Sequence, residues 1–131
     1  MTPNELFRLD YDLALALGWA DLKPGVGWYG TSPDGHERTF QYWLAEQDSL
    51  AKVGLDRLYE LLGRTAGYNH AHFQLSYEEG LLKAEYHLYR TDKVPGVEWQ
   101  EWTGDSPQNE QKPFYVATAK AIIKMVKELT E

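Results

Sequence analysis

Three segments of the chain place apolar residues at the spacing of an amphipathic helix. Apolar side chains recur every three or four positions over residues 3–17, 49–62 and 114–129, and this period brings them to one face of a helix. Thr2 and Glu5 fit the start of the first segment, because a threonine cap followed three residues later by glutamate forms a capping box. We therefore expect three helices.

Strict alternation of apolar and polar residues predicts a β-hairpin over residues 72–88. The apolar positions are Phe73, Leu75 and Tyr77, followed by Leu82, Ala84, Tyr86 and Leu88. If Glu79 and Gly80 form a two-residue turn, both apolar sets fall on the same face of the sheet. The agreement between the two alternations predicts that Tyr77 pairs with Leu82, Leu75 with Ala84 and Phe73 with Tyr86.

Two further regions have the composition of strands. Residues 26–31 and 37–43 are rich in aromatic side chains and flank Ser32-Pro33-Asp34-Gly35, a sequence typical of a type I turn, so they predict a second hairpin. Residues 97–102 predict one more strand. The segments 22–27 and 103–113 are expected to be loops, because they combine proline and glycine with polar residues.

This order of elements predicts a single α+β domain over residues 1–131. The expected order is helix, hairpin, helix, hairpin, helix, with an antiparallel sheet of about four to five strands packed by three helices. If the helices cover one face of the sheet, the fold has two layers. If they cover both faces, it is an α/β/α sandwich.

Composition and charge narrow the classes of function. The chain contains no cysteine, which excludes disulfides, thiolate metal sites and a cysteine nucleophile. A net charge of −7 argues against a nucleic-acid partner and leaves a basic protein partner open. The sequence has neither a secretion signal nor an apolar stretch of about 20 residues, so we expect a cytoplasmic protein that does not enter a membrane.

Three histidines form a candidate metal site. His70 and His72 point to the same side of a strand, and His72 faces His87 across the predicted hairpin, with Glu85 nearby. Three imidazoles and a carboxylate could bind Zn²⁺. The alternative is an ordinary polar strand face, since the sequence has no other recognised metal motif.

The tryptophan-rich segment that follows is a candidate binding surface. On a strand, Trp99 and Trp102 would point to opposite faces, so one could be buried and the other exposed. An exposed tryptophan beside Glu98 and Glu101 would suit a protein interface or a base-stacking platform. The alternative is that both tryptophans pack into the core.

The first helix ends in a motif that resembles a known family. Residues 14–19, with the sequence Ala-Leu-Ala-Leu-Gly-Trp, resemble the helix end near the start of the phage ABA sandwich domain proteins. The order of the later elements is also similar to that of this family. These elements are a helix starting near Asp48, a strand pair over 72–89 and an alanine-rich helix at 117–123. The resemblance implies a phage or prophage origin and transfers no catalytic residue.

Taken together, these features favour a non-catalytic, phage-derived protein that binds a protein partner, because no common catalytic motif is present. One alternative is a metal-binding protein or metal-dependent enzyme that uses the three histidines. Another is an acidic inhibitor of a host defence nuclease, which would gather Glu98, Glu101, Asp105 and Glu110 in one patch. A homo-oligomer paired through the aromatic hairpin at 26–43 is a further hypothesis.

Overall fold

The computed structural model describes residues 1–40, 50–61, 70–89 and 99–130, which form three helices and two three-stranded antiparallel sheets. The helices are α1 (Pro3–Ala16), α2 (Leu50–Leu61) and α3 (Pro113–Thr130). The first sheet contains β1 (Ala20–Pro24), β2 (Trp28–Thr31) and β3 (Glu37–Phe40). The second contains β4 (His70–Glu78), β5 (Leu81–Tyr89) and β6 (Trp99–Pro107). Among these described helices, none has the length and apolar character that a membrane crossing requires.

The α+β class is confirmed, and so is the register of the central hairpin. Tyr77 pairs with Leu82, Leu75 with Ala84 and Phe73 with Tyr86. Glu79 and Gly80 form the turn with φ values of 52° and 79°. Positive φ at both positions is the geometry of the two-residue turns that best match the twist of paired strands.

The structure has six strands in two separate sheets and not four to five in one, and two segments expected to be loops are partly strands. Ala20–Pro24 pairs with β2, although its register shifts between Ala20 and Lys23 and Asp21 takes a φ of 55°. This irregularity removes the alternation that marks a strand in the sequence. The predicted loop over residues 103–113 begins only after Pro107, because the first residues of this segment extend β6 along β5.

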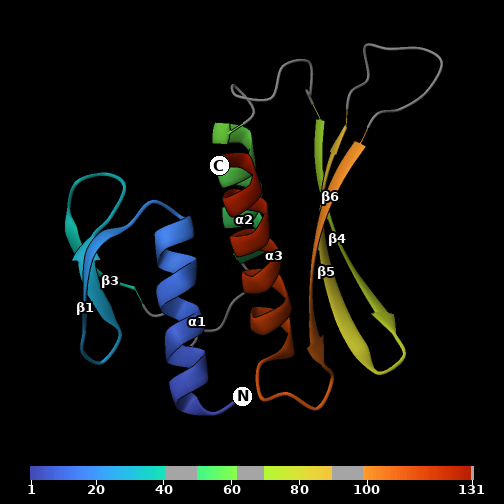
Figure 1. The fold of residues 1–131 in the computed structure, drawn as a ribbon, viewed down its shortest axis with the longest axis horizontal. Coiled ribbons are helices and arrows are strands. Elements are labelled where there is room, and N and C mark those ends of the chain that lie inside the picture. The colour runs from blue at the N-terminus through green and yellow to red at the C-terminus, as the bar shows by residue number, and fades with distance from the viewer. Residues whose placement is uncertain (41–49, 62–69, 90–98, 131) are drawn as a thin grey trace.

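The helices lie between the two sheets (Figure 1). α2 and α3 pack on one face of β4–β6, α1 packs against α3, and the first sheet lies on the far side of α1. Trp28 of β2 fixes this last contact, since its ring stacks on Phe7 at 4.4 Å and its indole N–H donates to the Phe7 carbonyl at 2.7 Å. An α/β/α sandwich is therefore wrong for the described residues, in which all helices lie on the same side of the second sheet.

Two glycines allow the helices to approach the second sheet closely. A Cβ atom added to Gly104 of β6 would lie 2.2 Å from the carbonyl oxygen of Ala117 and 2.5 Å from the amide nitrogen of Ala121, both in α3. A Cβ atom at Gly54 of α2 would lie 2.0 Å from the Tyr86 hydroxyl oxygen, which donates to the Ala51 carbonyl at 3.0 Å. Gly104 therefore lets the backbone of α3 approach β6 directly, and Gly54 leaves room for the Tyr86 side chain against α2.

A buried polar contact joins α1 to α3. The Tyr115 hydroxyl donates to Asp10 Oδ1 at 2.8 Å, and both side chains are enclosed in the core. Burial, together with the neighbouring Asp10 carboxyl group, raises the pKa of Tyr115. The contact fixes the position of α1 on α3, because a buried polar group is costly unless it is hydrogen-bonded.

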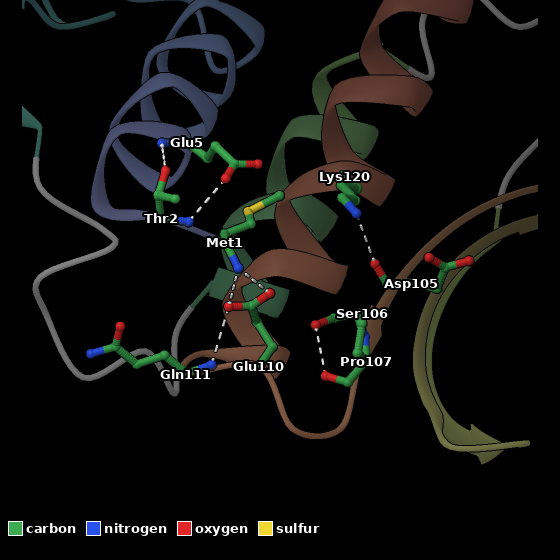
Figure 2. A network of polar contacts seen from close by, with 9 residues as sticks. All are labelled: Met1, Thr2, Glu5, Asp105, Ser106, Pro107, Glu110, Gln111 and Lys120. Atoms are coloured by element: carbon green, nitrogen blue, oxygen red, sulfur yellow. Dashed lines mark hydrogen bonds and ion pairs between the residues drawn. The ribbon is translucent and has the colours of Figure 1, made fainter.

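The start of α1 is attached to the segment that joins β6 to α3 (Figure 2). The ammonium group of Met1 lies 2.7 Å from both carboxylate oxygens of Glu110, and the backbone N–H of Gln111 donates to the same carboxylate at 3.2 Å. The hydrogen bond from the ammonium group lowers the pKa of Glu110. The predicted capping box of Thr2 and Glu5 is confirmed next to this contact.

We expect Gly104→Ala to lower the free energy of unfolding by about 2–3 kcal/mol, because the new methyl group would collide with the backbone of α3. Gly25→Ala is the matched control. Its Cβ atom would meet only the Gly27 carbonyl oxygen at 3.6 Å, an ordinary contact, so its effect should stay within about 0.5 kcal/mol. Urea unfolding measures both, and equal effects would show that this close approach is not important for stability.

We expect the protein to lose stability above pH ~10 in part through Tyr86 and Tyr115. Burial raises the pKa of both phenols, so the folded chain keeps protons that the unfolded chain releases above about pH 10. Tyr115→Phe should therefore reduce the fall of unfolding free energy per pH unit by up to about 1.4 kcal/mol. Urea unfolding from about pH 8 to about pH 11, on both sides of the ordinary tyrosine pKa, checks this. Exposed Tyr77→Phe is the control that should keep the wild-type slope.

Candidate metal centre

The face of the second sheet that points away from the helices, here called the outer face, is predominantly polar. Alternate residues of each strand point to it, since the other residues of β5 pack beneath the helices. In one row across the three strands, His72 pairs with His87, and His87 pairs with Glu101. In the next row, Gln74 pairs with Glu85. The register of the two ladders thus brings two imidazoles and two carboxylates together.

Glu85, His87 and Glu101 form the tightest group on this face. Each offers one nitrogen or oxygen atom such that all three atoms lie within 4.8 Å of one another. His87 Nε2 lies 3.4 Å from Glu85 Oε2. The His87 side chain is buried, Glu85 is half-buried and Glu101 is exposed, so the group opens to solvent on one side.

Two neighbours hold the imidazole and one of the carboxylates in place. The Gln74 side-chain amide donates to Glu85 Oε2 at 2.7 Å. The Tyr89 hydroxyl lies 3.4 Å from His87 Nδ1, and its ring stacks on the imidazole at 6.0 Å with an interplanar angle of 16°. Such outer contacts orient metal ligands and set which imidazole nitrogen is free to bind.

The spacing of the donor atoms fits a small divalent ion. Zinc binds imidazole nitrogen and carboxylate oxygen at about 2.0–2.2 Å in a tetrahedron, which places neighbouring ligand atoms roughly 3.3–3.6 Å apart. The observed 3.4 Å between His87 Nε2 and Glu85 Oε2 falls in this range. Glu101 is exposed, so its side chain can move to close the remaining distance.

Of the three predicted histidines, only His87 belongs to this tight group among the described residues, and the three-histidine site stays a prediction. His72 lies beside His87, with ring centroids 5.9 Å apart, but His70 lies one row farther along the sheet, with its ring 6.2 Å from that of Tyr89. His70 is not among the residues whose donor atoms lie within 4.8 Å of one another. Glu101 takes its place in the group.

Glu101 was predicted as part of a binding surface and not as a metal ligand. Its position opposite His87 depends on how β6 pairs with β5, and the nine residues between these strands leave that register open in the sequence. The sequence signal for the position of Glu101 was the alternation around Trp102. Successive residues of a strand point to opposite faces, so Glu101 lies on the face opposite Trp102.

Trp102, predicted as a candidate binding residue, lies in the core. Only 1% of its area is exposed, its side chain lies beneath the helices, and its indole N–H donates to the Glu128 carboxylate of α3. Trp99 pairs with Tyr89 through the backbone. The side chain of Trp99 and all of Glu98 lie outside the described residues.

The described carboxylates of the predicted acidic patch are dispersed and paired. Glu110 bonds the N-terminal ammonium group, and Glu101 belongs to the group around His87. Asp105 pairs along the ladder with Lys83, whose ammonium group lies 2.8 Å from Glu78. Glu98 lies outside the described residues, and the acidic nuclease inhibitor stays a prediction.

A shallow hollow of about 210 Å³ lies between α1, α2 and the first sheet. Its lining residues are Leu17, Trp19, Pro33, Phe40, Val53, Asp56, Arg57 and Glu60. The Arg57 guanidinium donates to the Ala16 carbonyl at 3.1 Å and to Glu60 at 2.9 Å, so it ties α2 to the end of α1. The hollow is smaller than a usual ligand pocket of about 300–1,000 Å³ and contains none of the predicted site residues.

Comparison with protein families, with curated proteins and with solved structures finds no match to this chain. The resemblance of residues 14–19 to the phage ABA sandwich domain proteins therefore stays a prediction.

Proposed function

We propose that this protein binds a divalent metal ion on the outer face of its second sheet. Glu85, His87 and Glu101 would be the ligands. The observation that carries the proposal is the 3.4 Å spacing of His87 Nε2 and Glu85 Oε2, together with the hydrogen bond from Gln74 that holds this carboxylate. A ligand held by a neighbour before the ion arrives loses less freedom on binding.

The donor set favours a first-row transition ion. One imidazole and two carboxylates suit Zn²⁺, Mn²⁺ or Fe²⁺, whereas Cu⁺ prefers thiolate and thioether sulfur and Ca²⁺ prefers six to eight oxygens. Three protein ligands leave at least one position for water. His72, exposed beside His87, can become a fourth ligand if its imidazole turns towards the ion.

Metal binding by this group does not require a catalytic role. The expected phage origin and the expected protein partner stay predictions, and neither is needed for the metal site. A metal-dependent reaction would require a substrate position beside the open coordination site. The outer face is a strand surface, and the one hollow described above lies elsewhere, between α1, α2 and the first sheet.

Metal binding is tested with Zn²⁺ and Mn²⁺ on chelator-treated protein, followed by calorimetry and thermal unfolding. We expect one ion per chain, and free metal at 100 times Kd should raise the free energy of unfolding by about 2.7 kcal/mol. His87→Ala should abolish this effect, because it removes the buried ligand. Gln74→Ala should weaken affinity by about 10-fold, since it releases the Glu85 carboxylate without removing a ligand.

His70→Ala is the matched control for these variants. It removes an imidazole from the same face of the same sheet but lies outside the group of three. It should keep wild-type affinity. An equal loss of binding in His70→Ala and His87→Ala would point to non-specific capture by surface histidines, and no binding by the wild-type protein would overturn the proposal.

A further inference from the structure

Within the part of the chain that the structure describes, β4 is a long edge strand that lacks the usual protection against pairing. It lies at the end of the order β4-β5-β6 and runs through nine consecutive pairs with β5 without a bulge. Its sequence, His-Ala-His-Phe-Gln-Leu-Ser-Tyr-Glu, contains neither lysine nor arginine nor proline. Soluble proteins normally protect such edges with lysine, proline, bulges or short strands, because an open edge pairs readily with another chain.

The edges of the first sheet show what this protection looks like in the same molecule. β1 has a register irregularity and contains Lys23 and Pro24. β3 has only four residues and begins with Glu37 and Arg38. The aromatic hairpin at 26–43 is therefore a poorer surface for self-association than β4, as far as the described residues extend.

The backbone of β4 is arranged to accept one more strand. Because Glu79 and Gly80 form a two-residue turn, Glu78 and Leu81 are the hydrogen-bonded pair that closes it. The bonding direction alternates along a strand, so the amide and carbonyl groups of the intervening residues point to the open edge. These residues are Ala71, Phe73, Leu75 and Tyr77.

The apolar side of β4 extends beyond the helices. Leu75 and Tyr77 point to the same face as buried Ala84 and Leu82, yet they are 41% and 72% exposed. Figure 1 shows the turn between β4 and β5 lying away from α2 and α3. Exposed large apolar side chains next to an open edge are typical of a surface that is covered in an assembly.

We propose that β4 pairs antiparallel with β4 of a second copy of this chain, across a two-fold axis at Gln74, to form a continuous six-stranded sheet. In this register all nine residues of β4 pair. Apolar residues meet apolar ones, with Phe73 opposite Leu75 of the second copy and Ala71 opposite Tyr77. A shift by two residues would keep each side chain on its face but would leave only seven pairs.

Charge complementarity favours a second copy over an unrelated strand. The two-fold register places His70 opposite Glu78 of the second copy at both ends of the interface, and it brings no like charges face to face. The hydrogen bond from Lys83 lowers the pKa of Glu78, so this carboxylate is ionised at neutral pH. An imidazole directly across from a carboxylate can donate a hydrogen bond to it, and such complementary pairs across two strands stabilise their pairing.

Sedimentation velocity of the full chain over a range of concentrations tests the proposal. We expect the mass to rise from the 15.1 kDa monomer to twice that value as concentration increases. Leu75→Lys should keep the protein monomeric, because it places a charge on the open edge. Leu15→Lys is the matched control, since Leu15 is similarly exposed at 46% but lies on α1, and it should still dimerise.

A charge exchange tests the register and does not depend on the folding of the Leu75 variant. His70→Glu alone should weaken the dimer, because glutamate would face Glu78 of the second copy. Combining it with Glu78→His should restore dimerisation, since each end again pairs opposite groups. A monomer at every accessible concentration, or a dimer that Leu15→Lys breaks and Leu75→Lys leaves intact, would overturn the proposal.

Hydrogen exchange gives a direct readout on the wild-type protein. On dimerisation the amides of Phe73, Leu75 and Tyr77 should become protected, because they point to the open edge. The amides of Gln74 and Ser76 bond β5 in the monomer and should change less. Equal protection at all of these positions, or none, would contradict strand pairing.

Discussion

The contact between α3 and the second sheet at Gly104 is the constraint on which the rest of the structure depends. The backbone of α3 reaches the backbone of β6 there, at Ala117 and Ala121, and this leaves no room for even a methyl group. α2 also packs through a glycine, but there Gly54 lies against a side chain, the buried hydroxyl group of Tyr86. Because both helices are held on one face, the opposite face of β4–β6 is free to carry polar side chains.

The candidate metal centre follows from this division of the sheet. His87 belongs to a strand whose alternate residues, Tyr86 and Leu88, are core residues, so its backbone is held rigidly. Neighbouring strands then supply Glu101 from β6 and Gln74 from β4. Ligands on strands of one packed sheet keep their spacing better than ligands on loops, which is why a small group of side chains can serve as a site.

The elements that sequence reasoning missed share a physical cause. β6 continues past Trp102 through Gly104, where α3 lies against the strand, and through buried Ser106. Both are small residues that look like loop residues in the sequence. β1 carries a register irregularity and a residue with positive φ, Asp21, so its alternation is broken. In both cases a tertiary contact or a local distortion replaced the apolar pattern on which prediction relies.

By itself, the sequence determined the three helices, the turn at Glu79 and Gly80, and the pairing of His72 with His87, because hydrogen bonds and alternation between neighbours along the chain decide these features. Only the tertiary structure decided that the strands divide into two sheets, that Trp102 is buried, and that Glu101 rather than His70 lies beside His87. These outcomes depend on contacts between segments far apart in the chain, whose register no local pattern encodes.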